Sequence, residues 1–328
     1  MKLLPGILAC AAVAAFAILL GRLAPIVGAP VFSIVAGVAI AALRIVPATI
    51  EPGASFVSRT LLQCSIVLLG ATLSVGEIVR GGVAALPVML GTFVIVLALA
   101  YVCGRALGLD RDLRRLLAIG TGICGGSAIA ALSSVIAVDA SDVAYALGTV
   151  FFFNVVAVLT FPPLGHALAL SQSAFGLWAG TAINDTSSVV AAAFAYGAQA
   201  GNTGVVVKLT RTLLIVPMVL FYAWKRLATR AGDEPPIPWR NIVPWFVLWF
   251  AVAAALNSLG AIPAAWEHAI QSVAWGAIVV ALAGVGLSAD VRRMRDAGLR
   301  PLALGAILWV AIAASSLAIA HLTGIDAR

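Results

Sequence analysis

The residues with the most potential for chemistry form two polar stretches in an otherwise apolar chain. The first, Gly120–Ala131, reads GTGICGGSAIAA. Each of its glycines weakens a helix interior by roughly 1 kcal/mol relative to alanine. We therefore expect a break at Gly120–Gly126, with Ser127 capping a new helix over Ala128–Val138. A broken helix is tolerated in a bilayer only where it lines a cavity or is buried in protein, so this break predicts half of a solute-binding site.

The chemistry that such a break offers is anion binding. The N-terminus of a half-helix carries a partial positive charge and free N–H groups. We expect the donors to be the hydroxyls of Thr121 and Ser127 and the backbone of Gly125 and Gly126. The alternative is that these small residues serve only the close packing of helices.

The second stretch, Gly180–Ala191, reads GTAINDTSSVVA and places Asn184 and Asp185 within an apolar segment. A carboxylate at this depth costs several kcal/mol unless it is paired or hydrated, so Asp185 is a candidate for binding a coupling proton or sodium ion. Asn184 and Ser188 would share one helical face with a spacing of four. In a second interpretation, compatible with the first, Asp185 caps a re-entrant helix that starts at Thr186.

Two cations follow in the stretch VVVKLTRTLLIVP. Lys208 and Arg211 are three residues apart and share a helical face. Facing a polar cavity, they would bind an anion or pair with Asp185. The alternative is that both snorkel to the outer headgroups, although that side is otherwise nearly free of Lys and Arg.

The remaining polar residues predict no catalytic or metal centre. Asn154 is expected to make an interhelical hydrogen bond. The three histidines are isolated, the four cysteines form no CxxC pair, and no catalytic or cofactor motif occurs. We expect no metal, no cofactor and no enzyme activity.

The amino-acid composition indicates the class of protein to which the chain belongs. Of 328 residues, 62% are hydrophobic and 10% are charged, against about 25% charged in a soluble domain. The sequence therefore predicts an all-α polytopic membrane protein. Its net charge of +7 would suit nucleic acid, but the basic residues lie in short loops between apolar segments, so nucleic acid is excluded as a partner.

About 20 apolar residues cross a bilayer, and the chain holds eleven candidate spans within one integral domain, 1–328. The elements that carry the site lie around 116–138 and 174–224. The expected spans are Pro5–Gly21, Ile26–Leu43, Thr60–Val79, Val83–Cys103, Leu116–Val138, Val143–Leu164, Ala174–Tyr196, Val205–Trp224, Ile242–Leu259, Ala269–Leu287 and Pro301–Leu322.

The basic residues orient these spans. With the N-terminus on side one, that side collects fifteen of them and the other side three, so side one is expected to be cytoplasmic and the C-terminus periplasmic. Side one has Lys2, Arg44, Arg59, Arg105, Arg111, Arg114, Arg115, Lys225, Arg226, Arg230, Arg240, Arg292, Arg293, Arg295 and Arg300; the other side has Arg22, Arg80 and Arg328.

The sequence also repeats itself in two places. Ser65–Gly81 resembles Ala277–Arg293, in spans expected to run in opposite directions, as in an inverted repeat. Gly120–Ala131 resembles Gly180–Ala191 more closely, in spans expected to run in the same direction. The two pairs therefore do not fit one duplication.

Four stretches together resemble the bacterial sulfate exporter family, the YeiH-type inner-membrane proteins. The similarity covers about Pro30 to Leu322, through GTGICGGSAIAA, Asp139-x-x-Asp142, AINDTSSVVAAA and VVKLTRTLLIVP. It implies an inner-membrane transporter whose fold is distantly related to bile-acid/sodium symporters and sodium–proton antiporters. That fold has a panel domain and a core domain with crossed, discontinuous helices.

We therefore expect a secondary transporter that moves a small anion, sulfate or a relative, by alternating access and with H⁺ or Na⁺ as coupling ion. A passive anion channel is the main alternative, and a membrane-embedded enzyme is a weaker one. A homodimer is suggested by analogy alone.

Overall fold

The computed structural model describes residues 3–24, 27–43, 47, 49–136, 138–228, 245–289 and 298–325. Within these ranges the chain is helical and contains no strand, which confirms the all-α class. Seven helical stretches are long and apolar enough to cross a membrane, and shorter apolar helices accompany them. The helices are α1 (Leu4–Leu23), α2 (Gly28–Ala42), α3 (Glu51–Phe56), the π turn η1 (Val57–Leu61), α4 (Leu62–Gly70), α5 (Val75–Ala106), α6 (Arg111–Gly122), α7 (Gly126–Ser133), α8 (Ala140–Ala167), α9 (Gln172–Ala182), α10 (Thr186–Tyr196), α11 (Ala198–Thr212), α12 (Ile215–Ala228), α14 (Trp245–Ser258), α15 (Ala264–Leu287) and α17 (Leu299–Leu322).

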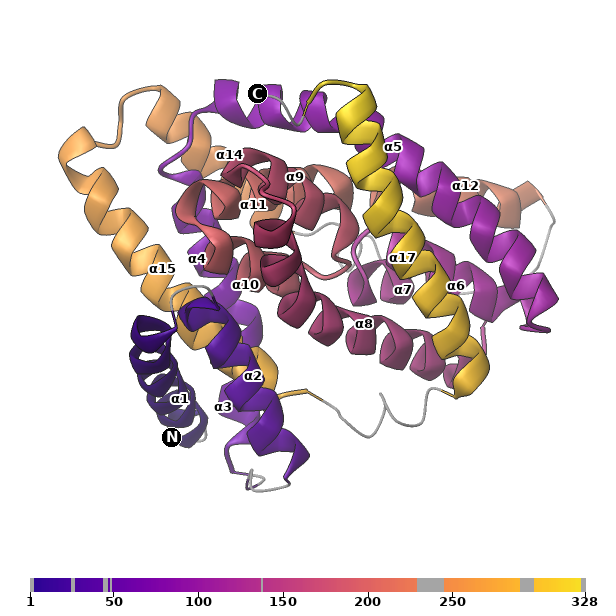
Figure 1. Cartoon of the computed structure of the whole chain (residues 1–328), viewed down its shortest axis with the longest axis horizontal. Coiled ribbons are helices and arrows are strands. Elements are labelled where there is room, and N and C mark those ends of the chain that lie inside the picture. The colour runs from indigo at the N-terminus through magenta and orange to yellow at the C-terminus, as the bar shows by residue number, and fades with distance from the viewer. Residues whose placement is uncertain are drawn as a thin grey trace.

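The helices form two groups (Figure 1). The first, called the panel here, consists of α1, α2, the continuous α3–η1–α4 segment, α14 and α15. Two glycine pairs bring its backbones together: a Cβ at Gly53 would lie 2.6 Å from the Cα of Gly6, and one at Gly286 would lie 2.8 Å from the Cα of Gly37. Small residues of this kind let membrane helices approach closely.

The second group, called the core here, consists of α5 to α12 and α17. Its longest helix, α5, begins at a capping box in which Ser74 and Glu77 satisfy each other's backbone N–H groups. The core meets the panel mainly where α10 packs against α2 and α15. A continuous apolar cluster fills this contact, with Ile34 and Ile278 from the panel and Val190 from the core.

The fifth expected span is a helical hairpin, α6–α7, rather than one crossing helix. A Cβ at Gly120 of α6 would lie 2.8 Å from the Cδ1 of Ile129, across the hairpin in α7. Gly126, at the start of α7, faces Leu147 and Phe151 well inside α8. The chain then returns to the start of α8, where Asp142 lies close enough to Asp110 for their charges to interact. Both ends of α6–α7 therefore lie at the N-terminal end of α8.

The seventh expected span folds back in the same way, as the hairpin α9–α10. The ring of Phe175 in α9 stacks on that of Tyr196 at the end of α10, with 3.9 Å between centroids. Tyr196 also donates to the carbonyl oxygen of Leu170 and stacks on His166, at the C-terminal end of α8. This hairpin therefore starts and finishes at the opposite end of α8 from α6–α7.

This folding back changes the expected directions. Since each hairpin returns to its starting end, α8 is a full traverse of 28 residues, about 42 Å long, and the hairpins approach from its two ends. Gly120–Ala131 and Gly180–Ala191 therefore point in opposite directions, and the expectation that they run the same way is wrong. In the other similar pair, residues 290–293 lie outside the described residues.

Candidate functional site

The tips of the two hairpins match residue for residue at an offset of 60 positions. Helices α6 and α9 end at Gly122 and Ala182, and helices α7 and α10 begin at Gly126 and Thr186. The tips touch, because a Cβ at Gly125 would lie 3.6 Å from the backbone nitrogen of Asp185. The similarity between the two sequences thus corresponds to two equivalent turns that meet inside the core.

Lys208 of α11 joins the two tips. Its Nζ donates to the carbonyl oxygens of Ile123 (2.9 Å) and Ile183 (3.0 Å), which occupy equivalent positions in the two turns. The side chain is fully buried.

Arg211, one helical turn further along α11, does the same with a second equivalent pair. Its Nη2 donates to the carbonyl oxygen of Thr121 at 2.7 Å, and its Nη1 donates to that of Thr181. Its Nε donates to the carbonyl oxygen of Gly122 at 2.9 Å. The guanidinium is also fully buried.

These contacts have a clear electrostatic cause. The last carbonyl groups of α6 and α9 have no intrahelical partners and carry the partial negative charge of the helix ends. Two buried cations supply five hydrogen bonds to them. Lys208 and Arg211 therefore act as a shared C-terminal cap for two half-helices.

This placement excludes snorkelling, since neither cation reaches the surface. No ion pair joins either of them to Asp185 among the described residues. Whether they also contact a solute stays a prediction, because in this conformation their neighbours are backbone carbonyl groups.

The two half-helices that begin at the tips, α7 and α10, differ in their N-caps. Asp185 is the N-cap of α10, and its carboxylate accepts from the backbone N–H of Ser187 at 2.9 Å and from the Ser187 hydroxyl. This confirms the interpretation of Asp185 as a cap for a helix starting at Thr186. At the equivalent position of the first hairpin, Gly125 has φ +69° and no side chain to cap α7. The first turn of α7 is therefore the uncapped positive end.

Two local expectations are wrong. Ser127 does not cap the second half-helix, because the left-handed conformation of Gly125 makes the turn two residues earlier and Ser127 becomes an exposed residue of α7. Asn184 and Ser188 do not share a helical face, because Asn184 lies in the turn before α10.

Two buried side-chain amides beside the tips each have one polar atom without a hydrogen-bond partner among the described residues. Asn154, midway along α8, accepts from the backbone N–H of Asp185 at 3.3 Å, which confirms its interhelical hydrogen bond. Its Nδ2 and the Oδ1 of Asn184 have no hydrogen-bond partner among the described residues, although both side chains are buried. Buried polar groups left in this state cost about 1–3 kcal/mol each, so a bound polar species would stabilise them.

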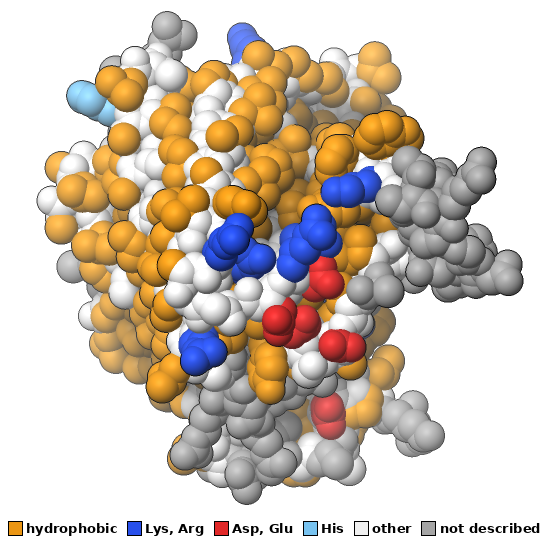
Figure 2. Space-filling view, turned by 90° about the vertical axis from the view of Figure 1, so that its right-hand side faces the viewer, with side chains coloured by type: hydrophobic (Ala, Val, Ile, Leu, Met, Phe, Trp, Pro, Cys, Tyr) orange, Lys and Arg blue, Asp and Glu red, His pale blue; other side chains and the backbone are white. Residues whose placement is uncertain are grey.

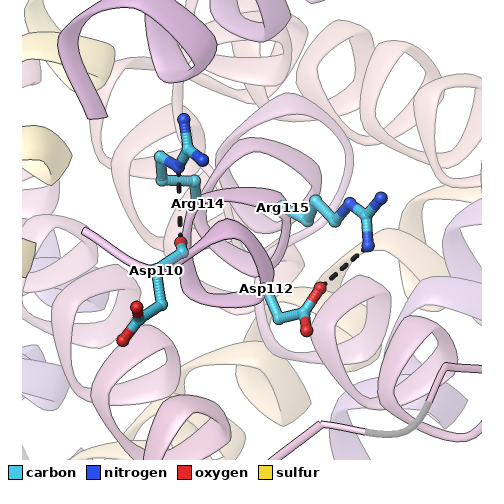
Figure 3. A network of polar contacts seen from close by, with 4 residues as sticks. All are labelled: Asp110, Asp112, Arg114 and Arg115. Atoms are coloured by element: carbon cyan, nitrogen blue, oxygen red, sulfur yellow. Dashed lines mark hydrogen bonds and ion pairs between the residues drawn. The ribbon is translucent and has the colours of Figure 1, made fainter. Parts of the chain in front are cut away.

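The base of the first hairpin is anchored at a charged patch. One face of the molecule gathers basic and acidic side chains within a largely hydrophobic surface (Figure 2). At the start of α6, Arg115 pairs with Asp112 at 2.8 Å, and Arg114 donates to the carbonyl oxygen of Asp110 at 3.4 Å (Figure 3). Arg115 also lies over the ring of Tyr222 in α12. The contact with Tyr222 joins this end of the hairpin to α12, whereas its tip is held by α11.

The expected site residues therefore do converge. Sequence reasoning missed the backbone carbonyl groups of Ile123 and Ile183 as the partners of Lys208, although the similarity of the two stretches was a signal for equivalent turns. Thr121 lies at this junction, because its carbonyl oxygen accepts from Arg211, and Ser188 is a buried residue in the first turn of α10.

Similar proteins are known from several bacteria. Residues 5–305 match the family described as conserved hypothetical protein 698. A UPF0324 membrane protein of Clostridium tetani is 37% identical over 92% of each chain. Another from Streptococcus pneumoniae is 38% identical, with 98% of this chain and 97% of the relative covered, and one from Streptococcus pyogenes is 39% identical, with 99% and 98% covered.

Proposed function

The chain belongs to this family of membrane proteins, and from that premise we propose that it is a secondary transporter for a small anion. The observation that carries the proposal is the meeting of two oppositely directed hairpin tips within the core. Broken helices at the centre of opposed repeats are the common location of substrate and coupling-ion sites in secondary transporters.

The charges at the tips favour an anion. The first turn of α7 offers backbone N–H groups with no side-chain cap at Gly125, and the hydroxyl of Ser127 is exposed beside them. Two cations and one carboxylate, Lys208, Arg211 and Asp185, leave a net charge of +1 when all three are ionised. Sulfate is the anion named by the resemblance of the sequence, and it is the first to test.

The carbonyl contacts favour a proton over sodium as the coupling ion. In transporters with broken helices, unwound carbonyl groups and half-helix C-termini coordinate Na⁺. Here the equivalent groups already bind Lys208 and Arg211. Asp185 is half-buried and caps α10 through Ser187, so its carboxylate is the group we assign to a coupling proton.

Counterflow in proteoliposomes tests the transporter proposal. We expect labelled sulfate, or another anion from a panel, to enter faster when the same anion is present inside, because a carrier exchanges solute and a passive channel does not. We further expect uptake without sodium and stimulation by an imposed proton gradient. Anion flux that does not respond to the same anion on the far side would contradict a carrier. Absence of counterflow for every anion in the panel would contradict the anion assignment.

Thermal stabilisation locates the site independently of transport. We expect an anion that is transported to raise the melting temperature of the wild-type chain, and the shift to shrink for Ser127→Ala, which removes only an exposed hydroxyl. Ser133→Ala, on the same helix but away from the tip, is the matched control. An unchanged shift in Ser127→Ala would remove that hydroxyl from the site.

A further inference from the structure

Three polar elements meet at one peptide unit of the hairpin tips. This unit joins Asn184 to Asp185, and a Cβ at Gly125 would lie 3.6 Å from both its carbonyl carbon and its nitrogen. The amide of Asn154, in α8, contacts the same unit, because its Oδ1 accepts from the N–H of Asp185 at 3.3 Å. The start of α7, the Asn154 amide and the side chain of Asn184 therefore lie around a single point.

The two side-chain amides at this point each present one unused polar atom. Asn154 is 3% exposed and Asn184 is 2% exposed, so both are buried. The Nδ2 of Asn154 and the Oδ1 of Asn184 have no hydrogen-bond partner within the described part of the chain. The first atom is a donor and the second is an acceptor. A ligand that satisfies both must therefore offer an acceptor and a donor.

The charges around this point indicate the class of ligand. Lys208 and Arg211 are buried, and their hydrogen bonds reach the carbonyl groups of both tips. With the carboxylate of Asp185 they leave one positive charge in excess when all three groups are ionised. The start of α7 adds partial positive charge without a side-chain cap from Gly125. A monovalent anion is favoured, but one without a proton would place an oxygen lone pair against the Oδ1 of Asn184.

Building on the anion site proposed above, we propose that the tips bind a monovalent oxyanion that still carries a hydroxyl group, such as bicarbonate. An unprotonated oxygen of this anion accepts from the Nδ2 of Asn154, and its hydroxyl donates to the Oδ1 of Asn184. Sulfate is fully deprotonated at neutral pH, offers no donor and should bind less tightly. A site built to hydrogen-bond a hydroxyl group rejects an analogue that lacks it.

Bicarbonate and nitrate are the matched probes for this proposal. Both are planar, monovalent and similar in size, but only bicarbonate has a hydroxyl group. We expect the wild-type chain to bind bicarbonate about tenfold or more tightly than nitrate, because nitrate leaves a buried acceptor unpaired. The melting temperature, measured against the concentration of each anion in closed cells at constant pH and ionic strength, gives both affinities. Equal affinities would overturn the proposal.

Asn184→Leu tests whether this residue recognises the hydroxyl group. Leucine has nearly the shape of asparagine without its polar atoms, so we expect the affinity for bicarbonate to fall to that for nitrate. Asn257→Leu is the matched control, because Asn257 lies in the panel and its Nδ2 donates to the carbonyl oxygen of Leu73 at 3.3 Å. This variant should keep the wild-type preference. A preference for bicarbonate that survives in Asn184→Leu would overturn the assignment, and the wild-type comparison decides even where the variant does not fold.

Counterflow of the same anions separates this specificity from transport itself. Bicarbonate counterflow without nitrate counterflow would support both proposals. Counterflow of nitrate or sulfate at the rate of bicarbonate would keep the transporter and overturn the requirement for a hydroxyl group. Selective binding of bicarbonate without counterflow would contradict the transporter and leave the binding site in place.

Discussion

At the scale of single residues, the central feature is a pair of buried cations whose partners are backbone carbonyl groups. A buried charge is stable only when its hydrogen-bonding capacity is used. Lys208 and Arg211 meet this condition by binding matched carbonyl groups in both hairpin turns. Each cation therefore contributes to stability by holding two separate hairpins in one arrangement.

Removal of the guanidinium should consequently destabilise the fold. In Arg211→Met, three buried carbonyl groups lose a charged donor, and we expect a loss of about 3 kcal/mol or more in the free energy of unfolding. Denaturant titration followed by tryptophan fluorescence measures this loss. Arg80→Met is the control, because Arg80 is exposed and bonds only within its own helix. Equal stability of the two variants would contradict the capping role.

Asp185 combines a structural role with a proposed chemical one, and two substitutions separate them. Asparagine is as good an N-cap as aspartate, whereas alanine costs about 1 kcal/mol. We therefore expect Asp185→Asn to keep wild-type stability and Asp185→Ala to lose about that amount. If the carboxylate carries the coupling proton, both variants lose proton-driven uptake but retain counterflow. Proton-driven uptake by Asp185→Asn at the wild-type rate would disprove the coupling role.

At the scale of elements, the two hairpins explain how the centre of the protein is built. Each turn interrupts a helical stretch midway, so the two turns together leave two carbonyl ends and two N–H ends inside the core. The carbonyl ends bind α11, and the N–H ends remain near the junction, one capped by Asp185 and one uncapped at Gly125. Glycine is required at position 125 by its φ of +69°, whereas the equivalent Asp185 has extended backbone.

Cysteine labelling from each side of the membrane tests whether the hairpins are re-entrant. We expect single cysteines at Asp110 and Ser141, which flank α6–α7, to react with an impermeant maleimide from one side. Cysteines at Gln172 and Gln199, which flank α9–α10, should react from the other side only. If α6–α7 instead crossed the membrane, Asp110 and Ser141 would be labelled from opposite sides. Inverted and right-side-out vesicles of a cysteine-free background provide the comparison.

The sequence contained enough information to predict the breaks but not the folding back. Glycine density marks the turn at Gly120–Gly126, and Asp185 before Thr186 marks the helix start. A hairpin of about 25 apolar residues has the same length and hydropathy as one crossing helix. The distribution of basic residues cannot separate the two, because no Lys or Arg occurs between Arg115 and Lys208. Replacing two crossing helices by two re-entrant hairpins changes the number of membrane crossings by two. Every loop with basic residues therefore stays on its expected side.

At the scale of the whole molecule, the division into panel and core suggests how the proposed transport would occur. Within the panel, backbones meet at glycine pairs such as Gly37 and Gly286, which favours a rigid body. The core is held together by α11 and both hairpins. The contact between the groups is apolar and is made mainly by α10 with α2 and α15. One hydrogen bond joins the groups away from this apolar contact, where the backbone N–H of Val75 at the start of α5 donates to the Ser258 hydroxyl of α14 at 2.8 Å. An apolar contact with an anchor at one edge allows two packed bodies to rock about that edge, as alternating access requires.

Tethering the core to the panel should therefore stop transport without removing the site. Val35 of α2 and Val155 of α8 line the same small cavity between the two groups. In a cysteine-free background, we expect a short crosslinker between Val35→Cys and Val155→Cys to abolish counterflow. The anion-induced rise in melting temperature should persist, since neither residue belongs to the hairpin tips. A tether within the panel, between Val67→Cys and Phe246→Cys, joins α4 to α14 and should leave counterflow intact. Because a channel needs no relative movement of the two groups to conduct, anion flux that survives the first tether would favour a channel, whereas its loss under the first tether alone would require a moving carrier.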